Sequence, residues 1–212
     1  MWLMALALTV LGIFFVLLLS EIWWYVRKPH DELSRKFIHI VVGSFAATWP
    51  FYLSWDQILL LSAAFIVVVA VSKYFHIFKA IHAVERPTWG EVYFAMAVGV
   101  LALVTQEPWI YAAALLHMSL ADGLAAVTGV TWGGKTEYKV FRQTKSIVGS
   151  ATFLVVSIGI LVAYSLLSGT VLSPLTIAGL AMTATAVENV GVAGLDNLLI
   201  PLLVGVALLY AA

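Results

Sequence analysis

Eight apolar segments alternate with short polar loops along this chain of 212 residues. We expect each segment to form a helix, because a run of about 20 apolar residues is the length that spans a bilayer. The fourth, seventh and eighth segments are short, and one that tilts or re-enters would leave seven crossings, so we predict seven or eight transmembrane helices. The segments lie at residues 2–25, 37–54, 57–76, 91–105, 108–128, 147–168, 171–187 and 197–211.

The composition strengthens this interpretation. Hydrophobic residues make up 63% of the chain, charged residues only 10%, and the mean hydropathy is +1.03, whereas a soluble domain carries about 25% charged residues. We therefore predict an all-α, polytopic integral membrane protein that forms a single unit over residues 1–212. The first segment lacks the basic start of a cleaved signal, so we expect it to remain as a span. Without cysteine, the chain has no disulfide, thiolate nucleophile or Cys-ligated metal.

The basic residues predict the orientation in the membrane. All 11 Lys and Arg residues lie between segments one and two, three and four, or five and six. The positive-inside rule therefore assigns these three loops to the cytoplasm and the N-terminus to the outside. The basic residues are Arg27, Lys28, Arg35, Lys36, Lys73, Lys79, Arg86, Lys135, Lys139, Arg142 and Lys145.

Most acidic residues of the loops and helix ends fall on the same predicted face. Asp56 and Glu107 are assigned to the outside. A bundle held only by apolar packing needs no such convergence, so we expect a functional site at the cytoplasmic surface. The converging acids are Glu32, Glu91, Asp122, Glu188 and Asp196.

The second segment opens with polar residues on one helical face. Glu32, Arg35, Lys36, His39 and Gly43 follow one another in steps of one to four residues. Two cations and an imidazole at similar depth suit a polyphosphate or a phosphorylated headgroup. The simpler alternative is snorkelling positive-inside residues beside a structural histidine.

Asp122 lies inside the fifth apolar segment, where a carboxylate is costly unless it lines a pathway or a site. The small residues that follow at helical spacing are explained by close helix packing, but that packing does not explain the aspartate. A buried carboxylate near cations is able to bind Mg²⁺ or to position an attacking hydroxyl group.

The loop from Gly133 to Ser146 contains a Gly-Gly pair and four basic residues, and we expect it to be flexible. Ser146 is a candidate N-cap for the next helix, whose free N–H groups form an anion site that includes Gly149. The loop lacks the spacing of a P-loop.

Two further stretches carry acids. Glu91 follows a Pro-rich break and lies in the first turn of a helix, where the helix dipole alone favours a carboxylate. Glu188 and the Asp196-Asn197 pair flank a glycine-containing turn without any basic residue. They are candidate ligands of a hard cation, and an ordinary capped turn is the equal alternative.

Together these stretches resemble the dolichol kinase and phytol kinase family, which also includes the CTP-dependent diacylglycerol kinase of yeast. The resemblance covers the chain from about Glu32 to Pro201, including the stretch from Arg86 to Glu91. The matching residues are Arg35, Lys36, His39 and Gly43; Asp122, Gly123, Gly129, Gly133, Gly134 and Lys135; Lys145, Ser146 and Gly149; and Glu188, Asp196, Asn197 and Pro201.

The resemblance implies an integral membrane enzyme that phosphorylates a lipid alcohol, characteristically with CTP. It implies that Asp122, Lys135, Lys145 and Ser146 belong to the nucleotide and catalytic site. Phosphatidate cytidylyltransferases are close to this family, but their signature has a Lys-Asp pair, whereas Lys145 is followed here by Ser146.

We therefore expect phosphoryl transfer at the cytoplasmic face, with a nucleoside triphosphate and a membrane lipid alcohol as partners and no nucleic acid. Cations would hold the triphosphate, and Asp122 with Glu188 or Asp196 would hold Mg²⁺; Asp122 is alternatively the base for the lipid hydroxyl. A cytidylyltransferase that makes a CDP-lipid is the first alternative, and a transporter or lipid-binding protein is the second. The expected phosphate ligands are Arg35, Lys36, His39, Gly123, Gly134, Lys135, Lys145, Ser146 and Gly149.

Overall fold

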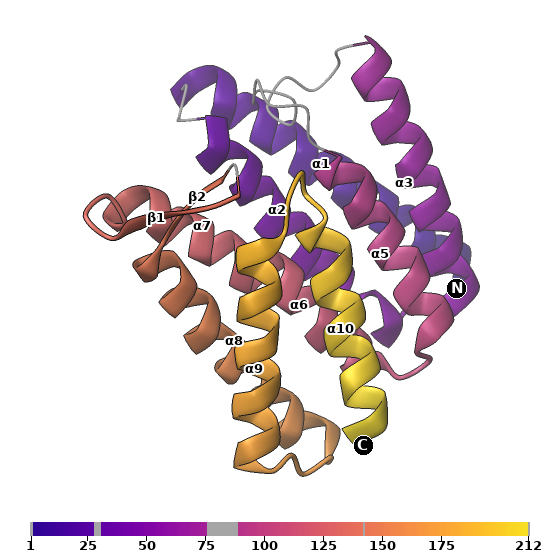
Figure 1. The fold of residues 1–212 in the computed structure, drawn as a ribbon. Helices are drawn as coiled ribbons and strands as arrows, with labels where there is room; N and C mark the ends of the chain where they lie inside the picture. Colours follow the sequence, from indigo (N-terminus) through magenta and orange to yellow (C-terminus); the bar gives the residue numbers. More distant parts are fainter. Residues whose placement is uncertain (1, 28–30, 76–88, 142, 212) are drawn as a thin grey trace.

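The computed structural model describes residues 2–27, 31–75, 89–141 and 143–211, and helix forms the greater part of each predicted apolar segment (Figure 1). A 3-10 turn, Trp49–Phe51, follows α2, and a π-helical turn, His117–Ala121, joins α6 to α7. The helices are α1 (Trp2–Arg27), α2 (Asp31–Ala47), α3 (Trp55–Phe75), α5 (Gly90–Val104), α6 (Pro108–Leu116), α7 (Asp122–Trp132), α8 (Ile147–Ser168), α9 (Pro174–Val190) and α10 (Asp196–Ala211).

Local sequence signals account for several helix ends. Pro108 and Pro174 lie in the first turns of α6 and α9, where a missing N–H costs no hydrogen bond. Ser173 caps α9 by accepting a hydrogen bond from the Thr176 amide at 3.0 Å. Gly169 ends α8 with φ +78°, a left-handed conformation that glycine adopts without strain.

A β-hairpin replaces the flexible loop expected between α7 and α8. Its strands are β1 (Glu137–Val140) and β2 (Gln143–Ser146), paired antiparallel with Tyr138 opposite Lys145. The alternation of more and less exposed residues along β1 is the pattern of a strand with one face against the protein. Within the described residues, the fold is therefore all-α except for this two-stranded ribbon.

The helices pack into one bundle around a continuous apolar core. Helix α3 lies beside α5, α7 lies beside α8, and α10 packs against α5, α6 and α9. Figure 1 shows the hairpin and the α9–α10 turn toward one end of the bundle and the α8–α9 loop at the opposite end. Asp122, Lys145 and Glu188 belong to or adjoin the elements of the first end, as the sequence predicts.

In the part of the chain that the structure describes, two continuous helical stretches are long and apolar enough to cross a membrane by length and composition: Pro108–Trp132, which includes the π-helical turn, and Ile147–Ser168. Shorter apolar stretches occur in α1, α3, α5 and α10. Large apolar side chains are exposed along the outer surfaces of α1 and α8, among them Phe14, Phe15, Val155 and Leu166. A surface of this kind suits contact with lipid. Seven or eight crossings and an outside N-terminus remain predictions.

Candidate functional site

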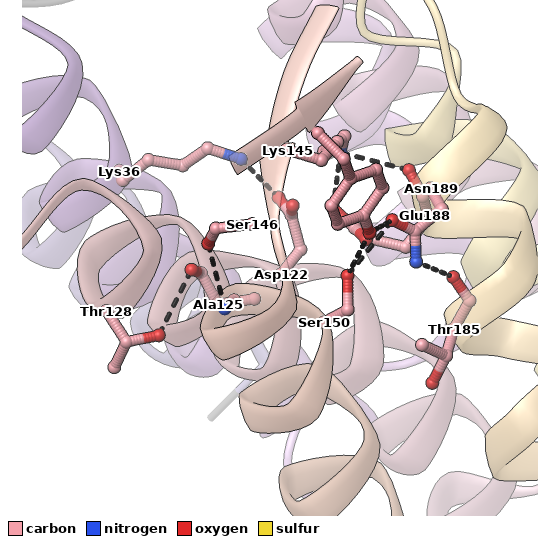
Figure 2. A network of polar contacts seen from close by, with 12 residues as sticks. Lys36, Asp122, Ala125, Thr128, Lys145, Ser146, Ser150, Thr185, Glu188 and Asn189 are labelled. Carbon is pink, nitrogen blue, oxygen red and sulfur yellow. Dashed lines mark hydrogen bonds and ion pairs between the residues drawn. The ribbon is translucent and has the colours of Figure 1, made fainter. Parts of the chain in front are cut away.

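A buried ion pair joins α2 to the start of α7. Lys36 Nζ donates a hydrogen bond to Asp122 Oδ2 at 2.5 Å, and the two side chains are only 7% and 4% exposed (Figure 2). Removing two charges from water costs more than an ion pair usually returns, so a pair of this kind is weak evidence for a stabilising role. A functional role for the ammonium and carboxylate groups therefore explains the buried pair better than a stabilising role does.

Two glycines let α2 come close enough for this pair to form. A Cβ atom on Gly123 would lie 2.1 Å from Ile40 Cγ1, and one on Gly43 would lie 2.3 Å from Ser119 Cβ. Both contacts lie between α2 and the α6–α7 segment. Gly123 and Gly43, which match the family pattern, therefore have a packing role in the described structure: they set the distance between the helices that carry Lys36 and Asp122.

The π-helical turn immediately before Asp122 changes the hydrogen bonding of the helix at the site. Such turns inside helices occur frequently at functional sites. Within this turn, the Met118 carbonyl accepts a hydrogen bond from His39 Nε2 at 3.0 Å. The same nitrogen lies 3.7 Å from Asp122 Oδ2, so His39 and Lys36 approach one carboxylate from the same helix. The expected face of α2 is confirmed for these two residues, whereas the side chains of Glu32 and Arg35 lie outside the described part of the chain.

A second ion pair joins β2 to the end of α9. Lys145 Nζ donates to the carboxylate of Glu188 and, at 3.0 Å, to the Glu188 backbone carbonyl (Figure 2). Burial by itself would lower the pKa of Lys145, but the surrounding carboxylates, Glu188 first among them, together raise this pKa above its ordinary value. Asp122 and Asp196 also raise the pKa of Lys145, so the two ion pairs share one electrostatic environment. Lys145 is a cation at neutral pH.

Hydrogen bonds between three side chains fix the hairpin beside this pair. Asn189 Oδ1 accepts from Tyr138 Oη and, at 3.0 Å, from Ser150 Oγ; the two hydroxyl oxygens lie 2.6 Å apart. Asn189 Nδ2 in turn donates to the Thr185 carbonyl at 2.9 Å. Tyr138 is the cross-strand neighbour of Lys145, and Asn189 follows Glu188, so this network holds both members of the second pair.

Tyr138, Ser150 and Asn189 were not predicted from the sequence. Each is an ordinary polar residue, and they are separated by 12 and 39 positions along the chain. In the sequence, only two features pointed to them: Asn189 follows Glu188, and Tyr138 lies in the basic loop.

Ser146 caps α8 as predicted, and this cap uses the amide that was expected to bind an anion. Ser146 Oγ accepts a hydrogen bond from the Gly149 amide at 3.0 Å. A Cβ atom on Gly149 would lie 2.9 Å from the Ala125 carbonyl oxygen, and one on Gly133 would lie 2.6 Å from Ser146 Cβ. In this structure Gly149 therefore serves the close contact of α7 with α8, and a phosphate-binding role for its amide stays a prediction.

The other predicted site residues lie at varying positions in the described structure. Lys135 and Gly134 are exposed in the turn after α7, and a Cβ atom on Gly134 would have no other atom within 4 Å. Asn197 is buried and donates from Nδ2 to the Gly90 carbonyl at 3.0 Å, beside Glu91 in the first turn of α5. Asp196 is half-buried in the first turn of α10.

The predicted metal ligands are not assembled as a group of three. Among the described residues, no cluster of three or more His, Asp or Glu side chains is arranged to hold a metal ion. Asp122 and Glu188 each face a lysine instead. Two carboxylates nevertheless fit Mg²⁺ bound together with a nucleotide, because that ion typically takes one or two carboxylates and completes its shell with phosphate oxygens and water.

Comparison with known proteins gives one informative similarity. The chain is 30% identical over 205 residues to the phytol kinase of Synechocystis sp., and the match covers 93% of this chain and 86% of that protein. No protein-family model matches the chain, and no solved structure matches it.

Proposed function

Because this chain belongs to the family of phytol kinases and related polyprenol kinases and is a phosphotransferase acting on an alcohol group, we propose that it phosphorylates a membrane lipid alcohol at the Lys36–Asp122 pair. The proposed donor is CTP, with Mg²⁺, and the proposed site faces the cytoplasm in a multi-pass membrane protein. CTP rests on the resemblance to the family, whose members characteristically use it.

The observation that carries the proposal is the burial of Lys36 with Asp122, close to Lys145 with Glu188. Two ammonium groups from different elements lie in one environment with two carboxylates, within a chain that is otherwise poor in charge. Phosphoryl transfer requires positioning and neutralisation of charge more than covalent chemistry. The two lysines are suited to neutralise the charge of a triphosphate, and the two carboxylates are suited to position the metal ion that it binds.

In the proposed reaction, the lipid hydroxyl oxygen forms a bond to the γ-phosphorus while the bond to the β,γ-bridging oxygen breaks. The nucleoside diphosphate is the leaving group. Lys36 and Lys145 neutralise the charge of the phosphate oxygens as this bond breaks. The hydroxyl proton passes to a carboxylate, for which Asp122 is the candidate; in the alternative role Asp122 binds the metal.

His39 has a supporting role in this scheme. Its Nε2 carries a hydrogen, because the Met118 carbonyl that it contacts is able only to accept. That hydrogen bond fixes the ring 3.7 Å from Asp122 Oδ2, so His39 stays beside the carboxylate without itself taking a proton at this nitrogen. Mg²⁺, when bound, would neutralise phosphate charge and align the triphosphate, with Asp122 and Glu188 as its carboxylate candidates.

The test uses purified protein in detergent or vesicles with Mg²⁺, γ-labelled CTP or ATP, and a panel of lipid alcohols. We expect label in a lipid product, faster with CTP than with ATP, and no transfer by the Asp122→Asn variant. The lipid product with ATP only would overturn the donor assignment. Full activity of the folded Asp122→Asn variant would overturn the site.

A phosphatidate acceptor is included in the same assay. Release of label as pyrophosphate together with formation of a CDP-lipid would replace the kinase reaction by nucleotidyl transfer. Absence of turnover with every acceptor and nucleotide, in protein that keeps its helical content, would overturn the proposed function.

A further inference from the structure

An apolar pocket opens beside the Lys36–Asp122 pair, between α1, α2, α3, α5 and the start of α10. Its walls include Ile38, Val42, Phe65, Val69 and Phe94. The surface that lines it is mostly apolar, which suits a hydrocarbon chain better than a nucleotide.

The polar groups of this pocket include His39, Glu91 and Asn197. His39 belongs both to the pocket wall and to the surroundings of Asp122, since its Nε2 lies 3.7 Å from Asp122 Oδ2. Glu91 and Asn197 are close to each other because Asn197 donates to the carbonyl of Gly90. A hydroxyl group at this place would be next to the buried pair, with its hydrocarbon chain in the apolar part.

A second, smaller apolar space continues the first along the bundle. The two spaces share Val42, Phe65 and Phe94 as wall residues, and the second adds Ile13, Trp49 and Val98. Between the first and second spaces, the lining residues move from Leu17 to Ile13 on α1 and from Gly90 to Val98 on α5. Eight residues of α5 correspond to about 12 Å along the helix axis.

The same step occurs on the other two helices. Lining residues move from Ile38 toward Trp49 beyond α2 and from Val69 to Leu61 on α3. From the first space to the second, the residue numbers rise along α2 and α5 and fall along α1 and α3. This is expected if all four steps run in the same direction, because α2 and α5 are antiparallel to α1 and α3. The spaces therefore lie one behind the other along the helices, leading away from the buried pair.

Phe94 lies at the junction of the two spaces. Its ring is edge-on to His39, with centroids 5.1 Å apart, and edge-on to Phe65 at 6.0 Å. The side chain is almost completely buried. The row His39, Phe94, Phe65 thus extends from the polar end of the first space to the entrance of the second.

We propose that these two spaces hold the chain of a single-chain lipid alcohol, hydroxyl at His39, and that Phe94 sets how far along the bundle a chain reaches. This proposal rests on the proposed function for the identity of the reacting group. Two in-line spaces suit one linear chain and not two chains side by side, which selects against a two-chain acceptor such as diacylglycerol. Phe94 is in this scheme a specificity-determining residue.

The activity test compares wild type, Phe94→Ala and Phe153→Ala on single-chain alcohols of increasing length and on a diacylglycerol. Phe153 is an equally buried phenylalanine on α8 and does not line either space, so it controls for loss of a core ring. We expect Phe94→Ala to raise the ratio of kcat/KM for long over short alcohols by at least ~10-fold, in the range that pocket changes produce, and Phe153→Ala to leave that ratio unchanged.

Val98→Phe fills the second space and should move the ratio in the opposite direction. It also keeps the proposal testable if Phe94→Ala does not fold. An unchanged ratio in either folded pocket variant, or phosphorylation of diacylglycerol as efficient as that of a single-chain alcohol, would overturn the proposal.

A binding measurement separates this proposal from the proposed function. A long-chain alcohol carrying a photoactivatable diazirine in its chain is added to wild-type protein without nucleotide, and the labelled peptides are identified by mass spectrometry. Label within residues 38–42 and 94–98, competed by unlabelled alcohol, supports the pocket even if no phosphorylation is found. Label confined to the outer surfaces of α8 and α9 overturns it even if the kinase reaction is confirmed.

Discussion

Lys36 and Asp122 are 86 residues apart in the chain, and their side chains meet at 2.5 Å in a buried position. Asp122→Asn leaves the Lys36 ammonium without an anionic partner, so we expect it to destabilise the fold by about 3 kcal/mol. We also expect kcat to fall at least ~100-fold, because the site loses a charge that acts on the reacting groups. Thermal unfolding and the labelled-CTP assay measure the two effects.

The double variant Lys36→Met/Asp122→Asn separates stability from function. It removes both charges, so most of the lost stability should return, while activity should stay as low as in either single variant. Recovery of activity together with stability would mean that the pair is structural only.

The close contact at Gly123 predicts a second result. Gly123→Ala places a Cβ 2.1 Å from Ile40 Cγ1, and the resulting separation of α2 from α7 should lengthen the Lys36–Asp122 contact. We expect a loss of about 1–3 kcal/mol in stability. We also expect kcat to fall by a larger factor than the fraction of protein that is folded. Both are measured on purified protein by thermal unfolding and by the lipid-kinase assay.

Gly159→Ala in α8 is the matched control, because the added Cβ atom would have no other atom within 4 Å. Helix propensity alone should make it neutral or stabilising by up to about 1 kcal/mol. Adding Ile40→Ala to the Gly123→Ala variant should restore its stability and turnover, because it removes the obstructing atom. Failure of this rescue would show that the glycine acts through something other than contact with Ile40.

The anchoring of the hairpin by Tyr138 predicts a third result. Tyr138→Phe removes the hydroxyl that bonds to Asn189, which should cost about 1 kcal/mol and loosen β1 and β2. Since Lys145, which neutralises phosphate charge in the proposed reaction, is the cross-strand neighbour of Tyr138, we expect kcat to fall and KM for the nucleotide to rise. Faster hydrogen exchange over residues 137–146 would report the loosening directly.

Tyr210→Phe is the control for this change, because Tyr210 is exposed at the end of α10 and far from the hairpin in the chain. It should match wild type in exchange, stability and nucleotide KM. An unaltered KM in Tyr138→Phe, despite faster exchange, would separate the hairpin from nucleotide binding.

The predicted orientation gives a fourth result, and the absence of cysteine makes it easy to measure. A single cysteine at exposed Lys139 in β1 should react with a membrane-impermeant maleimide only from the cytoplasmic side. A cysteine at Glu107, exposed between α5 and α6, should react only from the outside. Equal labelling of both after detergent treatment is the control, and the reverse pattern in intact cells would overturn the orientation.

Local patterns in the sequence were sufficient to locate the helices. Apolar runs, the proline at the start of α9 and the serine before α8 act over a few neighbouring residues, so the segments at 57–76 and 147–168 correspond closely to α3 and α8. The hairpin was missed because its strands are short and their alternation is masked by charged residues. The chain also contains a resemblance strong enough to identify the family from Asp122 and the residues around it.

The sequence by itself determined the helical architecture, the family and the residue types that gather at one end of the bundle. Only the tertiary structure decided their partners: Lys36 with Asp122, Lys145 with Glu188, and Tyr138 with Asn189. It also gave Gly123 a packing role and brought five helices together around one apolar space. The physical reason is that hydrophobic burial follows from local composition, whereas the pairing of charges depends on how closely distant helices approach, and contacts between their side chains set that distance.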